Sequence, residues 1–229
     1  MRVLDLIHLK ITAMNSNKLE DIRKQYQMAS LSESECGDDA IAQFEQWIEQ
    51  AITAEVREAT AMLLSTVDAD HRPHARVVLL KGIQDGQFIF YTNYQSDKGQ
   101  QLLANPAVAL TFFWPQLERQ VRIEGTVTKL DTQTSADYFR SRPRESQLSA
   151  WASPQSQVVN SQEELAANRE AKRKEFAGSE ELPLPPFWGG FLVAPQSIEF
   201  WQGRPNRLHD RIKYTANDKG IWKIKRLAP

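Results

Sequence analysis

Apolar residues recur every three or four positions near the start of the patterned part of the chain. They are Ile41, Phe44, Trp47, Ile48 and Ile52. This spacing places them on one stripe and predicts an amphipathic helix. The preceding residues 15–40 are polar and predict little regular structure. After Ala59 the pattern changes to short runs of β-branched and aromatic residues, which are typical of strands.

These runs predict five strands, at residues 62–67, 75–81, 88–92, 107–114 and 119–130. Asp85-Gly86 favours a tight hairpin turn between the second and third. Ser96 is placed to cap a short helix that ends at Asn105-Pro106.

A helical block is expected from about Thr132 to Phe176, divided by Pro143 and Pro154. In its last part, Ser161 and Glu164 have the spacing of a capping box. Strands resume at residues 190–193, 197–202, 208–214 and 221–226. Strands at short, regular spacing favour a mainly β fold, an antiparallel barrel with decorating helices, over a parallel βαβ sheet.

Charge and cysteine content narrow the function classes. Lys and Arg number 28 against 29 acidic residues, so the net charge of −1 predicts neither a nucleic-acid nor a membrane partner. The single cysteine, Cys36, excludes an intrachain disulfide and a cysteine zinc site, and it indicates a reducing, cytoplasmic location. No apolar run reaches the roughly 18 residues of a membrane span.

The first residues do not resemble a secretion signal, because Asp5 and His8 interrupt the apolar stretch. Met14 opens a more polar stretch, and we expect it to be the natural start, with residues 1–13 an extension. A disordered native tail is the alternative.

Arg207-Leu-His-Asp-Arg211 is the first candidate site. On a strand, Arg207, His209 and Arg211 would share one face. Three donors side by side favour an anion, and the nearby Phe200-Trp201 suits a planar ligand. A solvated outer face is the alternative.

The second candidate is the stretch from Tyr138 to Ser146. Tyr138 and Arg142 are four residues apart and would share a helix face. Pro143 is suited to the first position of the next helix, which places Ser146 in its first turn, where free N–H groups favour an anion. The pattern predicts a phosphate cradle, or else a basic surface loop paired with Glu145.

Other patterns give weaker evidence for a functional site. Arg76 and Lys81 bracket an apolar strand on opposite faces, and only a bulge would bring them together. His71 and His74 lack further ligands, so no metal site is predicted. The sequence has no Gly-rich phosphate loop and no Gly-x-Ser-x-Gly motif.

Taken together, the motifs resemble the pyridoxamine 5'-phosphate oxidase family from about Arg23 to Pro229. The matching segments are RVVLLK (76–81), FYTN (90–93), ERQVRIEG (118–125), YFRSRPRESQ (138–147), PPFWGGF (185–191), IEFWQG (198–203), RLHDR (207–211) and the closing KIKRLAP. Their number, order and spacing make the resemblance specific.

The resemblance implies an FMN-binding split β-barrel, a homodimer with FMN at the interface, and oxidation of pyridoxamine or pyridoxine 5'-phosphate to pyridoxal 5'-phosphate by O2, with hydrogen peroxide as product. It also implies that residues 1–40 form an N-terminal extension and mobile arm. Residues 41–229 would form the split-barrel domain, which includes a C-terminal segment for dimerisation and substrate binding. The flavin would supply the redox chemistry and the protein the orientation.

Carried over by position, the resemblance assigns two sets of residues. FMN contacts fall to Arg76, Val77, Val78, Leu79, Leu80, Lys81, Tyr91, Thr92, Lys98, Gln120, Gln155, Ser156, Trp201 and Arg211. Substrate contacts fall to Lys81, Tyr138, Arg142, Ser146, Arg207, Leu208, His209, Arg23 and Tyr26, with Arg207 and His209 as the catalytic pair.

Asp97 departs from the family, which often has an arginine there near the FMN phosphate. We expect the phosphate to rely on Arg76 and Lys98, with Asp97 turned outward or paired; weaker FMN binding is the alternative. Two rival functions stay open: another FMN split-barrel enzyme, such as a flavin reductase or a cofactor-F420-type oxidoreductase, and a non-catalytic carrier or sensor of flavin or pyridoxal phosphate.

Overall fold

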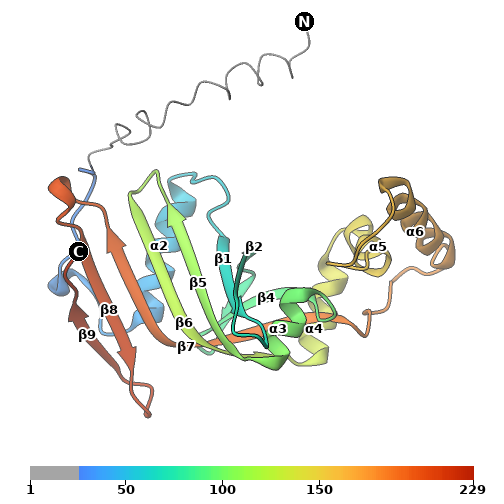
Figure 1. The fold of residues 1–229 in the computed structure, drawn as a ribbon. Coiled ribbons are helices and arrows are strands. Elements are labelled where there is room, and N and C mark those ends of the chain that lie inside the picture. Colours follow the sequence, from blue (N-terminus) through green and yellow to red (C-terminus); the bar gives the residue numbers. More distant parts are fainter. Residues whose placement is uncertain (1–25) are drawn as a thin grey trace, which may run out of the picture.

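The computed structural model describes residues 26–229. Within this range nine strands form one antiparallel sheet, in the order β2-β1-β5-β6-β7-β4-β3, with β8 and β9 continuing from β7. Figure 1 shows the sheet curling, with β8 and β9 at one end and helices α4, α5 and α6 at the other. The antiparallel arrangement and the mainly β class expected from the sequence are therefore confirmed.

The strands are β1 (Ala61–Val67), β2 (Pro73–Leu79), β3 (Gly82–Gln84), β4 (Gln87–Asn93), β5 (Ala107–Trp114), β6 (Arg119–Lys129), β7 (Trp188–Gln202), β8 (Asp210–Ala216) and β9 (Trp222–Arg226). The helices are α2 (Ala40–Thr53), α3 (Asp97–Ala104), α4 (Thr132–Ser141), α5 (Arg144–Ala152) and α6 (Gln162–Glu175), with short 3₁₀ turns η2 (Glu33–Glu35) and η3 (Pro205–Arg207). None of the helices in residues 26–229 is both long and apolar enough to cross a membrane.

The predicted helix starts are confirmed at two serines. Ser96 Oγ accepts the N–H of Gly99 at 3.3 Å, and Ser161 Oγ accepts the N–H of Glu164 at 3.2 Å. The Glu164 carboxylate accepts the N–H of Asn160 at 2.9 Å, one residue before the cap. Each cap satisfies a donor that the helix itself leaves free.

Helix α2 closes the main core over one face of the sheet. Phe44 is fully buried, with ring centroids 4.9 Å from Phe88 and 5.0 Å from Phe112. Burial of one such side chain contributes about 1.5–3 kcal/mol. Trp47 is also buried, but in the last turn Ala51 is fully buried and Ile52 is 57% exposed, so the buried face ends at Ala51 and not at Ile52 as predicted.

A second, smaller core joins α4, α5 and the end of α6 to the start of β7. It consists of Phe139, Leu148, Phe176, Leu182 and Trp188. This cluster fixes the helices α4 and α5 against the sheet, and they form one side of the cavity described below.

The two strands expected at 190–193 and 197–202 are one strand, β7, which pairs with β6 from Phe191 to Gln202. The register shifts between Glu124 and Gly125. A Cβ on Gly125 would lie 2.1 Å from the carbonyl oxygen of Ala194, so only glycine allows this close approach.

The strand expected at 208–214 begins at Asp210. The preceding η3 turn places Asn206 at φ 57° and Arg207 at φ 62°, in the left-handed region. The strand alternation predicted for Arg207, His209 and Arg211 is therefore wrong, because a turn interrupts it.

Candidate active site

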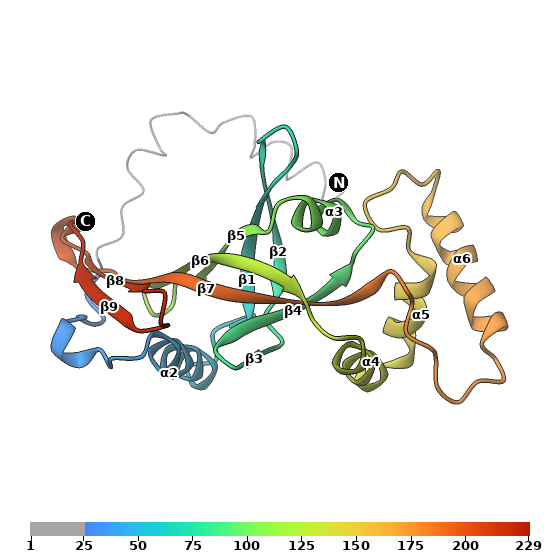
Figure 2. The same ribbon diagram turned by 90° about the horizontal axis from the view of Figure 1, so that it is seen from below.

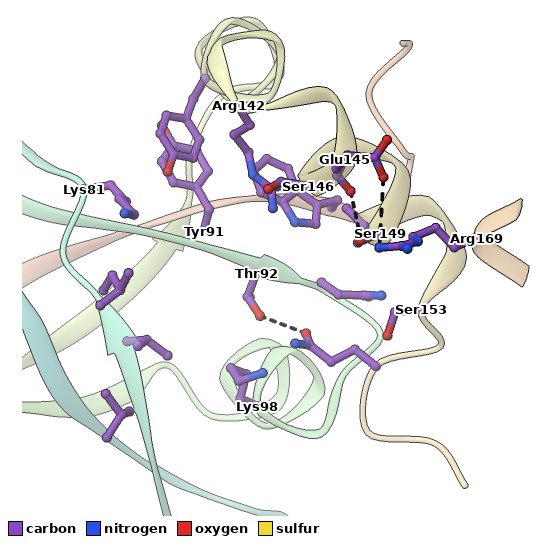
Figure 3. A pocket seen from close by; sticks show the side chains of 18 residues that line it. Lys81, Tyr91, Thr92, Lys98, Arg142, Glu145, Ser146, Ser149, Ser153 and Arg169 are labelled. Atoms are coloured by element: carbon purple, nitrogen blue, oxygen red, sulfur yellow. Dashed lines mark hydrogen bonds and ion pairs between the residues drawn. The ribbon is translucent and has the colours of Figure 1, made fainter. Parts of the chain in front are cut away.

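A cavity of about 660 Å³ lies between β2 and β4 on one side and α4 and α5 on the other (Figure 3). This volume is in the usual range for a small-molecule site. The sequence-predicted residues that line it are Val77, Val78, Leu79, Lys81, Tyr91, Thr92, Lys98, Tyr138, Arg142, Ser146 and Gln155. Most of the predicted FMN and substrate contacts from the middle of the chain therefore line the same cavity.

The junction of α4 and α5 forms one wall. Helix α4 ends at Ser141, and Arg142 follows in extended conformation, with φ −73° and ψ 150°. Tyr138 and Arg142 thus line the cavity together without sharing a helix face, which corrects the prediction. Pro143 is the N-cap of α5 rather than its first residue, and Ser146 lies in the first turn as predicted.

Arg142 is a half-buried cation without a counter-ion among the described residues. Its Nη1 atom is buried and has no hydrogen-bond partner there. Desolvation lowers the pKa of its guanidinium, and the nearby Tyr138 opposes this shift. An unpartnered buried charge costs free energy, which an anion in the cavity would offset.

Stacked aromatic rings support the same wall. The Tyr91 and Tyr138 centroids are 3.9 Å apart with planes at 15°, and Trp188 stacks on Tyr91 at 5.4 Å. Burial raises the pKa of both tyrosines, so their phenols stay protonated and able to donate at neutral pH.

Lys98 on α3 lines the opposite wall, and Arg76 lies close behind it. Desolvation, then the charge of Arg76, lowers the pKa of Lys98. The Arg76 guanidinium donates to Thr66 Oγ1 at 2.5 Å and to Gln101 Oε1 at 3.0 Å, and Arg76 does not line the cavity. Asp97 is exposed, which agrees with the expectation that its side chain turns outward.

Lys81 lines the cavity without the β-bulge that the sequence analysis considered. Strand β2 ends at Leu79, before Lys81, and its pairing with β1 shows no register shift. Lys81 therefore lines the cavity, whereas Arg76 does not.

A second cluster lies at the other end of the sheet. The Trp201 ring centroid is 4.7 Å from His209 and 5.7 Å from Tyr26. His209 Nδ1 accepts the backbone N–H of Arg204 at 3.1 Å. Because Nδ1 is an acceptor here, the neutral imidazole carries its proton on Nε2.

Arg211 belongs to this second cluster. It donates from Nε and Nη2 to the two carboxylate oxygens of Glu199, at 2.8 and 3.1 Å, and from Nη1 to the Ala228 carbonyl at 3.0 Å. The hydrogen bonds that Arg211 donates to Glu199 raise the pKa of its guanidinium. Gln120 lies opposite Trp201 in the pairing of β6 and β7.

The two clusters do not meet within one chain. Figure 2 shows α4 and α5 at one end of the sheet and β8 at the other. The predicted residues that do not line the cavity are Tyr26, Arg76, Leu80, Gln120, Ser156, Trp201, Arg207, Leu208, His209 and Arg211. Arg23 lies outside the described residues.

Several cavity residues were missed by sequence reasoning. They are Asn93, Glu145, Ser149, Ala150, Ser153, Arg169 and Trp188. Ser149 follows Ser146 by three residues and Ser153 follows Ser149 by four, so the helical pattern contained a signal for them. Arg169 comes from α6, and no local pattern links it to the cavity. Figure 3 shows its side chain beside Glu145, with Nη1 4.0 Å from the carboxylate.

One sheet surface near the cavity exposes apolar side chains. Val77 is 67% exposed, Leu63 40% and Phe113 54%, and Leu63 lies opposite Val77 in the β1–β2 pairing. Neighbouring exposed apolar side chains are characteristic of a contact surface.

Comparison with protein families gives two matches. The model described as pyridoxamine 5'-phosphate oxidase matches residues 48–174, and the model described as the C-terminal dimerisation region of pyridoxine 5'-phosphate oxidase matches residues 188–229.

Similar proteins cover nearly the whole chain. The pyridoxine/pyridoxamine 5'-phosphate oxidases of Salinibacter ruber and Chromobacterium violaceum are 51% and 53% identical, over 93% of this chain and 100% of theirs. The solved structure of PhzG from Burkholderia lata, in complex with tetrahydrophenazine-1-carboxylic acid, has a TM-score of 0.82 and 27% identity, over 90% of this chain and 100% of that one. An FMN-binding protein from Nostoc punctiforme shares the fold, with a TM-score of 0.64 and 18% identity, over 81% of this chain and 97% of that one.

Proposed function

Since the chain belongs to the pyridoxamine 5'-phosphate oxidase family, we propose that it oxidises pyridoxamine or pyridoxine 5'-phosphate to pyridoxal 5'-phosphate with O2 as electron acceptor. The observation that carries the proposal is the buried, unpartnered Nη1 of Arg142 at the cavity wall. This donor fits the phosphate that both substrates share.

We assign the substrate phosphate to the cradle of Tyr138, Arg142, Ser146 and Lys81. All four line one cavity, and they offer a phenol, a guanidinium, a hydroxyl in the first turn of α5, and an ammonium group. The N-terminal N–H groups of α5 add a favourable dipole. Glu145 would repel a phosphate, but Arg173 holds its carboxylate at 2.7 Å.

The other wall of the cavity fits FMN. Lys98 is a partly buried cation there, Thr92 Oγ1 lies 3.4 Å from Gln155 Oε1, and Val77 to Leu79 form an apolar surface for a flat ring. Arg76 adds positive charge behind Lys98. Bound FMN would supply the redox chemistry of both half-reactions, the oxidation of the substrate at C4' and the reduction of O2 to hydrogen peroxide.

A homodimer would complete the site. Gln120, Trp201 and Arg211, assigned to FMN, lie at the far end of the sheet from the cavity, so a second copy of the chain would have to supply them. The exposed apolar side chains of Leu63 on β1 and Val77, which lines the cavity from β2, would provide a surface for that copy. The match to a dimerisation region at residues 188–229 supports the same arrangement.

Arg207 and His209 would then reach the substrate from the second copy. Arg207 is exposed at the η3 turn, where its guanidinium can approach the pyridine ring. His209 is held by the Arg204 N–H on Nδ1, which leaves Nε2 to exchange a proton with the C4' substituent. The pair would orient that substituent for oxidation, and an amine substrate would release ammonia.

The test is the absorption spectrum of the purified holoenzyme before and after anaerobic addition of pyridoxamine 5'-phosphate. Flavin bands that bleach, and that return with peroxide when air is admitted, are the expected result. Bands that persist would favour a carrier, and bleaching by a reduced nicotinamide alone would favour a flavin reductase. A colourless protein that binds no added FMN would contradict the proposal.

A further inference from the structure

The segment from Tyr26 to Cys36 crosses the C-terminal strands and is tied to them by charged side chains. We propose that Glu118, Arg204, Asp210 and Arg226 form a clasp that positions Tyr26 against His209, and that they act as positioning residues for the substrate step. The inference rests on the proposed function, because it gives Tyr26 and His209 a role at the substrate.

The first part of the clasp is Glu118, which lies just before β6. Its side chain is buried, and its Oε2 accepts the backbone N–H groups of Gln27 at 2.8 Å and Met28 at 3.1 Å. Hydrogen bonds to a charged acceptor are about twice as strong as neutral ones. Glu118 therefore fixes the chain immediately after Tyr26.

Asp210, the first residue of β8, is the second part. Its Oδ2 accepts the N–H of Leu31 at 3.0 Å and lies 3.4 Å from Arg204 Nε. Arg204 in turn donates from Nη1 to the carbonyl of Ala29 at 3.1 Å. One carboxylate and one guanidinium thus hold both a donor and an acceptor of the segment backbone.

Arg226 on β9 is the third part. It donates to the Leu31 carbonyl at 3.0 Å, to Asp210 Oδ1 at 2.7 Å, and to both carboxylate oxygens of Glu33 at 3.0 and 2.8 Å. A guanidinium that contacts a carbonyl and two carboxylates fixes the geometry more tightly than a single surface ion pair.

The clasp acts where the segment meets the candidate catalytic histidine. The Tyr26 ring lies edge-on to His209, with centroids 5.8 Å apart, and a Cβ on Gly203 would approach Tyr26 to 2.7 Å. Arg204 serves both sides, because its backbone N–H holds His209 Nδ1 while its side chain holds Ala29. Loss of the clasp would free Tyr26, while the backbone N–H of Arg204 would still hold the imidazole.

The experiment compares Arg204→Met and Arg226→Met with Arg72→Met in the FMN-loaded enzyme. Arg72 is a matched control, because its side chain is 74% exposed on the β1–β2 turn and, among the described residues, forms an ion pair with Asp70 alone, at 3.9 Å. Hydrogen exchange of the 26–36 peptide, read by mass spectrometry without substrate, should be about tenfold faster in both clasp variants and unchanged in the control. The KM for pyridoxamine 5'-phosphate should rise about tenfold, with kcat within about threefold.

Arg226→Lys should recover part of the exchange protection and part of the KM, since it keeps the charge but not the fork of donors. Unchanged exchange in the clasp variants would overturn the inference, and so would faster exchange with an unchanged KM. Failure of the proposed function is a separate result, because it appears as absent turnover in the unaltered holoenzyme.

Discussion

The guanidinium carbon of Arg142 lies 4.8 Å from the centroid of the Trp188 indole ring. Stacking of this kind holds a planar cation by its face and leaves its edge free to donate. Trp188 therefore keeps the unpartnered Nη1 of Arg142 ready for an anion. The first two predictions concern this pair.

Arg142→Ala should raise the KM for pyridoxamine 5'-phosphate roughly 10- to 100-fold with a smaller effect on kcat, because it removes a charged contact present in both ground and transition states. Arg140→Ala is the control, since Arg140 lies on α4 two residues before Arg142 but pairs with Asp137 at the surface. Steady-state kinetics of both variants, at equal FMN content, check the prediction. Equal KM values in the two would argue against the cradle.

Trp188→Leu should raise the same KM by roughly 3- to 10-fold, because a cation–π contact contributes about 0.5–2 kcal/mol. Trp188→Phe keeps an aromatic face and should stay closer to the unaltered enzyme. Phosphate protection against thermal unfolding provides a second measurement. A leucine variant with normal KM would mean that Arg142 holds its place without the indole.

Arg207→Ala should lower kcat about 100-fold or more while FMN stays bound, because the residue is assigned to orienting the reacting group and not to the flavin. The measurement is the turnover number beside the flavin absorbance of the purified variant. Activity within a few-fold of the unaltered enzyme would remove the assigned role.

Lys98→Met should stabilise the FMN-free protein and weaken FMN binding. Burial lowers the pKa of Lys98 below its ordinary 10.5, so its charged form is penalised in the native state at neutral pH. The stability gain, on the order of 2 °C in Tm, should shrink as pH rises through the folded pKa toward 10.5. The FMN Kd should rise roughly 10- to 100-fold. A destabilised FMN-free variant would contradict this account.

Asp97→Arg should change the FMN Kd by less than about threefold, because the Asp97 side chain is exposed and solvent screens its charge. Flavin fluorescence titration measures the Kd directly. Strong tightening would mean that the native carboxylate limits FMN binding and that Arg76 and Lys98 are not sufficient for the phosphate.

The hydrophobic pattern predicted most of the fold because helices and strands differ in the spacing of their apolar residues. The stripe around Phe44 and Trp47 and the serine caps at Ser96 and Ser161 are local signals, and the structure contains them. The η3 turn was missed because the alternation of Arg207, His209 and Arg211 was interpreted without Pro205-Asn206, two residue types that are typical of turns.

The sequence identified many residues of the candidate site but not which of them come together in space. The motif residues Tyr138, Arg142 and Ser146 were found because they are close in sequence. Arg169 and Trp188 were missed because tertiary packing alone brings α6 and β7 to the cavity. Residue lists carried over from a family also conceal which subunit each residue belongs to, and only the structure separated the cavity from the cluster around Trp201.

That separation has a genetic consequence. If each complete site combines the Arg142 cradle of one subunit with the Arg207 turn of the other, two chains impaired at different residues can rescue each other. A heterodimer of Arg142→Ala and Arg207→Ala chains would hold one site with both defects and one with none. Co-expression of the two variants would then restore, at low substrate concentration, a catalytic efficiency that neither homodimer has.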